Sequence, residues 1–178
     1  MSEYLTPEQY LPHRPPMCLI DRVVRIDGKT VVCETKACLG GRLDLFRNPD
    51  ENVSTAPIIE LMAQTVGVWA GERRIRLKQS ERPEDEQDAP LGLLLSVRGL
   101  KILVDAIDKD AVLTMTMQLL IDESRLTSFE GTVTMNGIPA ARGRLTVFQP
   151  TNGELKDLFP AKPTGETPEE TIDNKGNL

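Results

Sequence analysis

The fold is decided by the most apolar stretch of the chain, which covers residues 56–70. It reads Ala56-Pro57-Ile58-Ile59-Glu60-Leu61-Met62-Ala63-Gln64-Thr65-Val66-Gly67-Val68-Trp69-Ala70. Only Glu60, Gln64 and Thr65 are polar, so a helix over this stretch is apolar nearly all round. A helix of that kind is surrounded by protein rather than lying on a surface. The stretch therefore predicts one long buried helix at the centre of the fold.

Signals at both ends set the length of this helix. Ser54 or Thr55 can cap its start, and Pro57 suits the first turn, where a backbone N–H has no helical partner. The far end is basic, which suits a helix C-terminus and water. Its cations are Arg73, Arg74, Arg76 and Lys78. We expect the helix to run to about Lys78, before a charged loop over residues 79–90.

The segments on both sides of the helix have the pattern of β-strands. Before it, residues 18–26 and 31–39 flank the turn signal Asp27-Gly28. After it, strand-like runs follow at 91–98, 100–104, 111–121, 126–136 and 139–148. This order predicts an α+β fold in which an antiparallel sheet wraps around one helix. Because one sheet leaves a helix face bare, we also expect a second subunit, and hence a dimer.

The net charge of -6 belongs to two segments rather than to the whole chain. Residues 81–88 hold five acids against one arginine, and residues 151–178 hold six acids against three lysines. The remainder is close to neutral, and it has no platform of basic and aromatic residues, so nucleic-acid binding is not expected. The polar segment after about Phe159 is expected to be disordered.

The cysteines and the N-terminus indicate the compartment. Cys18, Cys33 and Cys38 lie in apolar or strand-like runs without metal-ligand spacing, so we expect free thiols, no metal site and a reducing environment. A nucleophilic Cys18 close to His13 is the alternative. No secretory leader and no membrane-spanning apolar run is present in the sequence, so the chain is expected to be cytoplasmic, without membrane association.

Two residues are candidates for proton-transfer chemistry. His13 is the one histidine of the chain, and histidine is the usual acid or base near neutral pH. Glu60 lies in the apolar stretch, where burial can raise a carboxyl pKa and keep the group protonated as an acid. The structural alternatives are a loop histidine bonded to a carbonyl, and a carboxylate paired with the helix N-terminus or with Arg14 or Arg22.

A family resemblance adds to this interpretation. The opening Leu11-Pro12-His13-Arg14-Pro15-Pro16-Met17-Cys18-Leu19-Ile20-Asp21-Arg22-Val23 resembles that of the 3-hydroxyacyl-acyl-carrier-protein dehydratases of the FabZ and FabA type. Glu60-Leu61-Met62-Ala63-Gln64 looks like their central-helix motif, and residues 131–150 look like their closing hairpin. The chain is most similar to the ApeP branch, associated with aryl polyene biosynthesis, where a stretch like Glu60 to Trp69 is expected.

The resemblance implies a fold, a reaction and partners. It implies a hotdog fold over residues 1–159, followed by a tail over 160–178, and loss of water from a 3-hydroxyacyl thioester held on an acyl carrier protein. The active site would lie between subunits of a homodimer or a heterodimer, with no cofactor. Backbone N–H groups near Thr55 and Ala56 would bind the thioester oxygen, whereas Pro57 has no N–H to give.

The chain departs from the family at one position. The main family has its catalytic histidine in a loop before the helix, and that place falls on Phe46 here. His13 matches an additional family histidine, and it is the only imidazole left to serve as the base. Gln64, one turn after Glu60, is expected to orient that carboxyl or bind the acyl chain, with a buried structural amide as the alternative.

Three functions remain open at this point. The leading one is a dehydratase in which His13 is the base and Glu60 the acid. The second is a non-catalytic partner that stabilises an active relative, which Phe46 favours. The third is a hotdog thioesterase in which Glu60 activates water. The arginines near the helix end are candidates for docking an acidic carrier protein, with solvated helix-end cations as the alternative.

Overall fold

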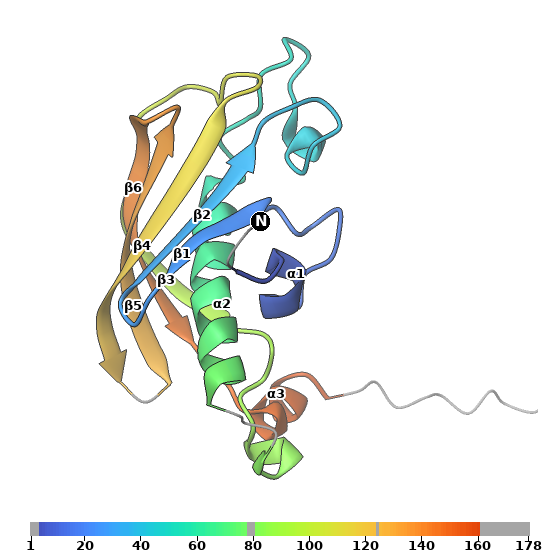
Figure 1. Cartoon of the computed structure of the whole chain (residues 1–178). Helices are drawn as coiled ribbons and strands as arrows, with labels where there is room; N and C mark the ends of the chain where they lie inside the picture. Colours follow the sequence, from blue (N-terminus) through green and yellow to red (C-terminus); the bar gives the residue numbers. More distant parts are fainter. Residues whose placement is uncertain (1–3, 78–80, 124, 161–178) are drawn as a thin grey trace, which may run out of the picture.

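The computed structural model describes residues 4–77, 81–123 and 125–160, and within them one antiparallel sheet curves around one long helix (Figure 1). The sheet has six strands in the order β1-β2-β4-β5-β6-β3. Their bounds are β1 Arg22–Ile26, β2 Thr30–Lys36, β3 Leu93–Ile102, β4 Val112–Glu123, β5 Leu126–Met135 and β6 Ile138–Phe148. The helix, α2, spans Ile58–Arg76. The α+β prediction with a sheet wrapped around a central helix is therefore confirmed.

Helix α2 is buried against the inner face of the sheet, as its composition predicts. Leu61, Met62 and Val68 have no exposed surface, and the polar Gln64 and Thr65 are buried as well. The helix packs against β2, β4 and β5. Close packing is possible at Met62 because β5 has Gly131 there, where any Cβ would collide with the Met62 and Met117 side chains.

The start of α2 differs from the prediction. Pro57 is the N-cap residue and no side chain caps the helix. The Ser54 hydroxyl instead accepts a hydrogen bond from the Ala56 N–H at 3.3 Å, so it closes a local turn before the helix begins. The Thr55 carbonyl accepts from the Ile58 N–H. The predicted end at Lys78 lies just outside the described residues, and the helix is described to Arg76.

Two strand boundaries also differ, each for a local reason. β1 begins at Arg22 rather than at Cys18, because the Leu19 N–H bonds to the Gln64 side chain of α2 instead of a neighbouring strand. β3 is one strand rather than two: its register shifts between Arg98 and Lys101, and Gly99 there has φ +60. The gap that the sequence pattern shows between the runs 91–98 and 100–104 is thus a β-bulge within one strand.

Two short helices lie outside the central pair of layers. α1 spans Pro7–Tyr10, and Thr6 and Gln9 form a capping box at its start. α3 spans Asn152–Leu158, is capped by Thr151, and was not predicted. It lies beside the 3-10 turn η3, Glu84–Glu86, with which Asn152 and Lys156 form polar contacts. Residues 161–178 lie outside the described residues, so the tail stays a prediction.

Among the described residues, no helix is both long and apolar enough to cross a membrane.

Glycine at position 71 lets the N-terminal segment approach α2. A Cβ on Gly71 would lie 2.4 Å from the backbone oxygen of Tyr10, whereas a Cβ on Gly67, one turn earlier, would meet only the tip of the Leu11 side chain at 2.7 Å. Arg74 reinforces the contact by donating to the Tyr10 carbonyl at 3.2 Å. The segment that leads to His13 is therefore held directly against the helix that holds Glu60.

Gly71→Ala is expected to destabilise the protein, because backbone cannot move aside as a side-chain tip can. Overpacking of this kind costs about 1–3 kcal/mol, which corresponds to a fall in Tm of roughly 2–4 °C per kcal/mol for a domain of this size. Gly67→Ala is the matched control, and thermal unfolding should leave its Tm nearly unchanged. Equal Tm values for the two variants would show that the Tyr10 contact is unimportant.

Candidate active site

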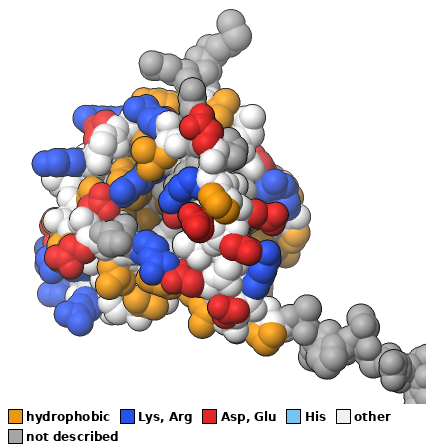
Figure 2. Space-filling model, turned by 90° about the horizontal axis from the view of Figure 1, so that it is seen from below, with side chains coloured by type: hydrophobic (Ala, Val, Ile, Leu, Met, Phe, Trp, Pro, Cys, Tyr) orange, Lys and Arg blue, Asp and Glu red, His pale blue; other side chains and the backbone are white. Residues whose placement is uncertain are grey.

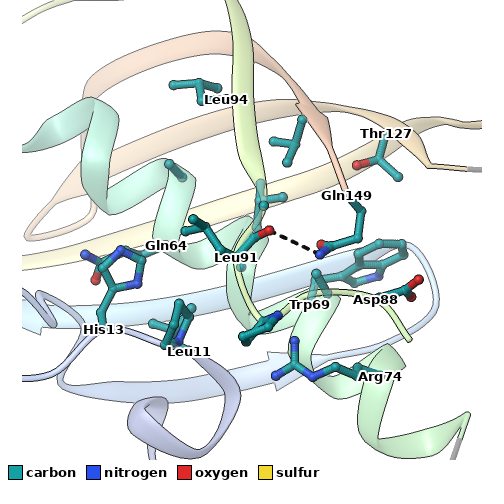
Figure 3. A pocket seen from close by; sticks show the side chains of 18 of the residues that line it. Leu11, His13, Gln64, Trp69, Arg74, Asp88, Leu91, Leu94, Thr127 and Gln149 are labelled. Atoms are coloured by element: carbon teal, nitrogen blue, oxygen red, sulfur yellow. Dashed lines mark hydrogen bonds between the residues drawn. The ribbon is translucent and has the colours of Figure 1, made fainter. Parts of the chain in front are cut away.

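A cavity of about 250 Å³ lies along one side of α2, and both predicted catalytic residues, His13 and Glu60, line it. Figure 3 shows His13 at one end of this cavity. The cavity is enclosed by α2, the N-terminal loop, the segment that leads into β3, and the ends of β5 and β6. The lining residues are Leu11, Pro12, His13, Glu60, Ala63, Gln64, Val66, Gly67, Trp69, Ala70, Arg73, Arg74, Asp88, Pro90, Leu91, Gly92, Leu94, Thr127, Val147 and Gln149. Apolar side chains form much of this wall, as in sites that receive small organic ligands.

Gln64 ties the N-terminal loop to the carboxyl group. Its Oε1 accepts from the Leu19 N–H at 2.8 Å, and its Nε2 donates to the Met17 carbonyl at 2.7 Å. Nε2 also donates to Oε1 of Glu60 at 2.8 Å. Since only the amide oxygen can accept from Leu19, the orientation of the amide follows from this network. Gln64 is therefore a buried structural amide that also holds the Glu60 carboxyl group. The structural role and the orienting role predicted for Gln64 are compatible.

Glu60 is more exposed than its apolar neighbours in the sequence suggest. Its side chain is 40% exposed, because it lies on the helix face that borders the cavity. Neither arginine considered as its partner binds it: Arg14 donates to backbone carbonyls, and Arg22 pairs with Glu34. With Oε1 accepting from Gln64, the proton of a neutral Glu60 belongs on Oε2. Among the described residues, Oε2 has no hydrogen-bond partner.

His13 lies beside Glu60 within the same chain. Its Nε2 is 3.6 Å from Oε1 of Glu60, slightly beyond hydrogen-bond distance. Its Nδ1 is buried and has no hydrogen-bond partner among the described residues. No carbonyl therefore fixes this ring, unlike the structural loop histidine considered as an alternative. The resemblance implies an active site between subunits, and the structure already brings the one histidine and the carboxyl group together within one chain.

The other predicted site residues do not line the cavity. Thr55 and Ala56 are not among the described residues that line the cavity, and the Ala56 N–H is bonded to Ser54. Phe46 ends the 3-10 turn η1, Asp44–Phe46, and packs partly buried against the core, away from the cavity lining. The structure therefore brings His13, Glu60 and Gln64 together, but not Thr55 and Ala56.

The far end of the cavity holds residues that the sequence did not select as site residues: Asp88, Thr127 and Gln149 had no predicted role, and Arg74 was a candidate only for carrier docking. Trp69, Arg74, Asp88, Thr127 and Gln149 gather there, at the opposite end from His13 (Figure 3). Gln149 donates to the carbonyls of Ala89 and Leu91, which holds the end of the 79–90 loop against β6. The sequence of that loop alone gives no functional signal. Burial lowers the pKa of the Arg74 guanidinium, and Asp88 opposes that shift.

The arginines at the end of α2 are occupied within the chain. Arg73 pairs with Asp122, Arg76 pairs with Glu72, and Arg74 binds the Tyr10 carbonyl. Seen from the end at which α2 finishes, the surface mixes acidic and basic side chains (Figure 2). These contacts favour structural helix-end cations over the carrier-docking alternative. Lys78 lies outside the described residues.

The cysteine alternative is not supported by the structure. Cys18 is fully buried, and burial raises the pKa of its thiol. Burial also raises the pKa of Cys33 to about 12. A thiol acts as a nucleophile in its thiolate form, which this environment disfavours. Among the described residues, no group of three or more His, Cys, Asp or Glu side chains is placed to hold a metal ion.

The chain matches a known protein family over most of its length. The family model described as ApeP dehydratase matches residues 5–159. The chain is similar to one in the structure of the dehydratase heterocomplex ApeI:P from Xenorhabdus doucetiae, with 34% identity and a TM-score of 0.79. That match covers 89% of this chain and 100% of the other chain.

More distant structures share the fold alone. A hypothetical thioesterase with coenzyme A from Streptococcus pneumoniae TIGR4 has 18% identity and a TM-score of 0.52, with 73% of this chain and 85% of that chain covered. A mutant thioesterase from Staphylococcus aureus subsp. aureus Mu50 has 13% identity and a TM-score of 0.53, with 72% and 92% covered. These hotdog-type neighbours confirm the predicted fold, and the match over residues 5–159 shows that the chain belongs to the ApeP-like dehydratase family.

Proposed function

We propose that this chain dehydrates a 3-hydroxyacyl thioester on an acyl carrier protein to the trans-2-enoyl thioester. The observation that supports the proposal is the pair formed by Nε2 of His13 and Oε1 of Glu60, 3.6 Å apart, at the wall of a largely apolar cavity. The reaction needs a base for a weakly acidic C2 proton and an acid for a poor leaving group. An imidazole and a carboxyl group are suited to these two tasks.

The proposed step moves two protons. Nε2 of neutral His13 takes the proton from C2, and the C–H electron pair forms the C2–C3 double bond. The C3–O bond breaks, and Glu60 gives its proton from Oε2 to the departing hydroxyl, which leaves as water. His13 ends as a cation and Glu60 as an anion, so their proximity stabilises both products. A proton returned from His13 to Glu60 then restores the starting state.

The position of the pair restricts the stereochemistry. Both groups lie at the same stretch of wall and are too close for the substrate carbons to pass between them. The C2 hydrogen and the C3 hydroxyl must therefore leave from the same face of the substrate. In this proposal the thioester oxygen binds backbone N–H groups near Thr55 and Ala56, where the Ala56 N–H exchanges its Ser54 partner for that oxygen.

The proposal includes a carrier protein and a second hotdog subunit, in fatty acid or aryl polyene type biosynthesis in the cytoplasm. β3 is an edge strand of the sheet, and its side chains Leu94 and Leu95 are exposed, which supports pairing with another subunit there. The similar Xenorhabdus structure is a heterocomplex, which supports a heterodimer as well as a homodimer. On the outer face of the sheet, Arg98 lies directly opposite Arg144, and Lys101 lies opposite Arg142. Glu130 pairs with Arg144 at 3.9 Å, and the remaining excess of cations suits an acidic carrier.

One observation favours a second function, that of a non-catalytic partner subunit. Phe46 stands where the main family has its catalytic histidine, and it packs against the core. In addition, the buried Nδ1 of His13 has no partner to stabilise an imidazolium. In this alternative the chain provides shape and the carrier site, while a related subunit provides the chemistry. A thioesterase, in which Glu60 activates water, is supported only by fold likeness.

The identity of the product separates a dehydratase from a thioesterase. The purified chain, alone and with a co-expressed hotdog subunit, is incubated with a 3-hydroxyacyl carrier protein, and the carrier is followed by intact-mass spectrometry. We expect the carrier to lose the mass of one water while its thioester stays intact. Release of the free 3-hydroxy acid would indicate a thioesterase and contradict the proposal.

A further inference from the structure

Two hollows lie on either side of the C-terminal half of α2, and they share a wall. The first is the cavity that holds Glu60 and His13. The second, of about 260 Å³, lies between the end of α2, the β1–β2 turn and Asp122 at the end of β4. Of the residues that line each hollow, Trp69 and Arg73 are common to both. These two side chains therefore separate the hollows.

The wall is held by packing and charge. The indole of Trp69 is 7% exposed and meets the ring of Phe129 edge-on, at 5.2 Å between centroids and 74° between planes. The guanidinium of Arg73 lies 5.5 Å from the centroid of the indole. Nη1 of Arg73 donates to both carboxylate oxygens of Asp122, at 2.9 and 2.8 Å. The indole is thus fixed between a core ring and an anchored cation, which leaves it little freedom to swing aside.

We propose that Trp69, held in place by Arg73, ends the acyl cavity and sets the longest acyl chain that the protein binds. The inference rests on the proposed function, because it takes the cavity beside Glu60 to be the acyl site. Trp69 follows Glu60 by nine positions on α2, which corresponds to about 13 Å along the helix axis at 1.5 Å per residue. An acyl chain that runs from Glu60 along the whole cavity reaches the indole at the far end, opposite His13, and the second hollow lies behind the indole (Figure 3).

The test measures binding rather than turnover. Acyl pantetheines of increasing length without a 3-hydroxyl group are titrated by calorimetry into the protein in its assembled state. For the wild type, affinity should rise with chain length up to a limit and then stop rising. For Trp69→Leu, the limit should move to longer chains, and two further methylenes should strengthen binding by about sixteenfold, since each buried methylene contributes about fourfold.

Two further variants protect the test against a folding failure. Arg73→Ala leaves the indole in the core but removes its outer support. The longest acyl chain that still gains affinity should therefore become longer, but by less than in Trp69→Leu. Arg76→Ala is the matched control, because Arg76 lines the second hollow but not the first. Trp69 is also the one tryptophan of the sequence, so wild-type fluorescence should change only for chains long enough to reach it.

The outcomes distinguish this inference from the proposed function. A limit that moves in Trp69→Leu and Arg73→Ala supports the inference even if no water is eliminated by the wild type. An unchanged limit in both variants overturns it, even if the protein proves to be an active dehydratase. Failure of the wild type to bind any acyl pantetheine also overturns it.

Discussion

Replacement of Glu60 by glutamine is expected to lower kcat for dehydration by a factor of about 10²–10⁴, the usual contribution of a positioned acid or base. The amide has nearly the shape of the carboxyl group and still offers Gln64 an acceptor, so the network around Leu19 and Met17 should persist. What is lost is a proton that can be given to a leaving hydroxyl. The substitution therefore separates chemistry from folding.

The measurement is single-turnover dehydration of a 3-hydroxyacyl carrier protein, together with thermal unfolding of each variant. Glu72→Gln is the matched control: Glu72 lies on the same helix, pairs with Arg76 and does not line the cavity. We expect the control to keep the wild-type rate and both variants to keep a Tm close to that of the wild type. A Glu60→Gln rate within a factor of two of the wild type would exclude Glu60 as the acid.

Replacement of Gln64 by leucine is expected to affect both stability and rate. The Leu19 N–H, in a residue with no exposed surface, would lose its acceptor, and a buried donor without a partner costs about 1–3 kcal/mol. For a domain of this size, each kcal/mol lowers Tm by roughly 2–4 °C. Glu60 would also lose the donor that orients it, so the dehydration rate should fall even below the unfolding temperature.

Thr65→Val is the control for this prediction. Thr65 is the next residue of α2 and is equally buried, but its hydroxyl donates to the Leu61 carbonyl of the same helix. Its loss leaves no backbone N–H without an acceptor, so we expect a much smaller change in Tm and in rate. If urea unfolding gives Gln64→Leu and Thr65→Val the same free energy of unfolding, Gln64 does not connect the loop to the helix as described.

The fold was predictable where local chemistry decides it. The apolar run around Glu60 predicts a buried helix, and Asn136-Gly137 predicts the β5–β6 hairpin, in which both residues have positive φ as such a turn requires. The prediction was wrong where a distant group decides the local structure. The first strand starts late because Gln64 takes the Leu19 N–H, and α3 forms where the polar composition suggested only an irregular segment.

Part of the candidate site could be predicted from the sequence, but its arrangement could not. The resemblance to the dehydratases identifies His13, Glu60 and Gln64, yet their positions in the sequence do not show that the histidine and the carboxyl meet within one chain. That meeting depends on Gly71, which admits the Tyr10 backbone, and on the Gln64 bonds to residues 17 and 19. The wall at Trp69 depends in turn on Asp122, which lies on β4, a strand far from α2 in the sequence.

The central claim is that the His13–Glu60 pair of this chain performs the elimination. The most direct measurement pairs this chain with a co-expressed hotdog subunit, mutates one subunit at a time, and follows loss of water from a 3-hydroxyacyl carrier protein by intact-mass spectrometry. Our account predicts that His13→Ala or Glu60→Gln in this chain abolishes the loss of water while the other subunit is unaltered. Wild-type loss of water with both substitutions present in this chain would contradict it and assign the chemistry to the partner.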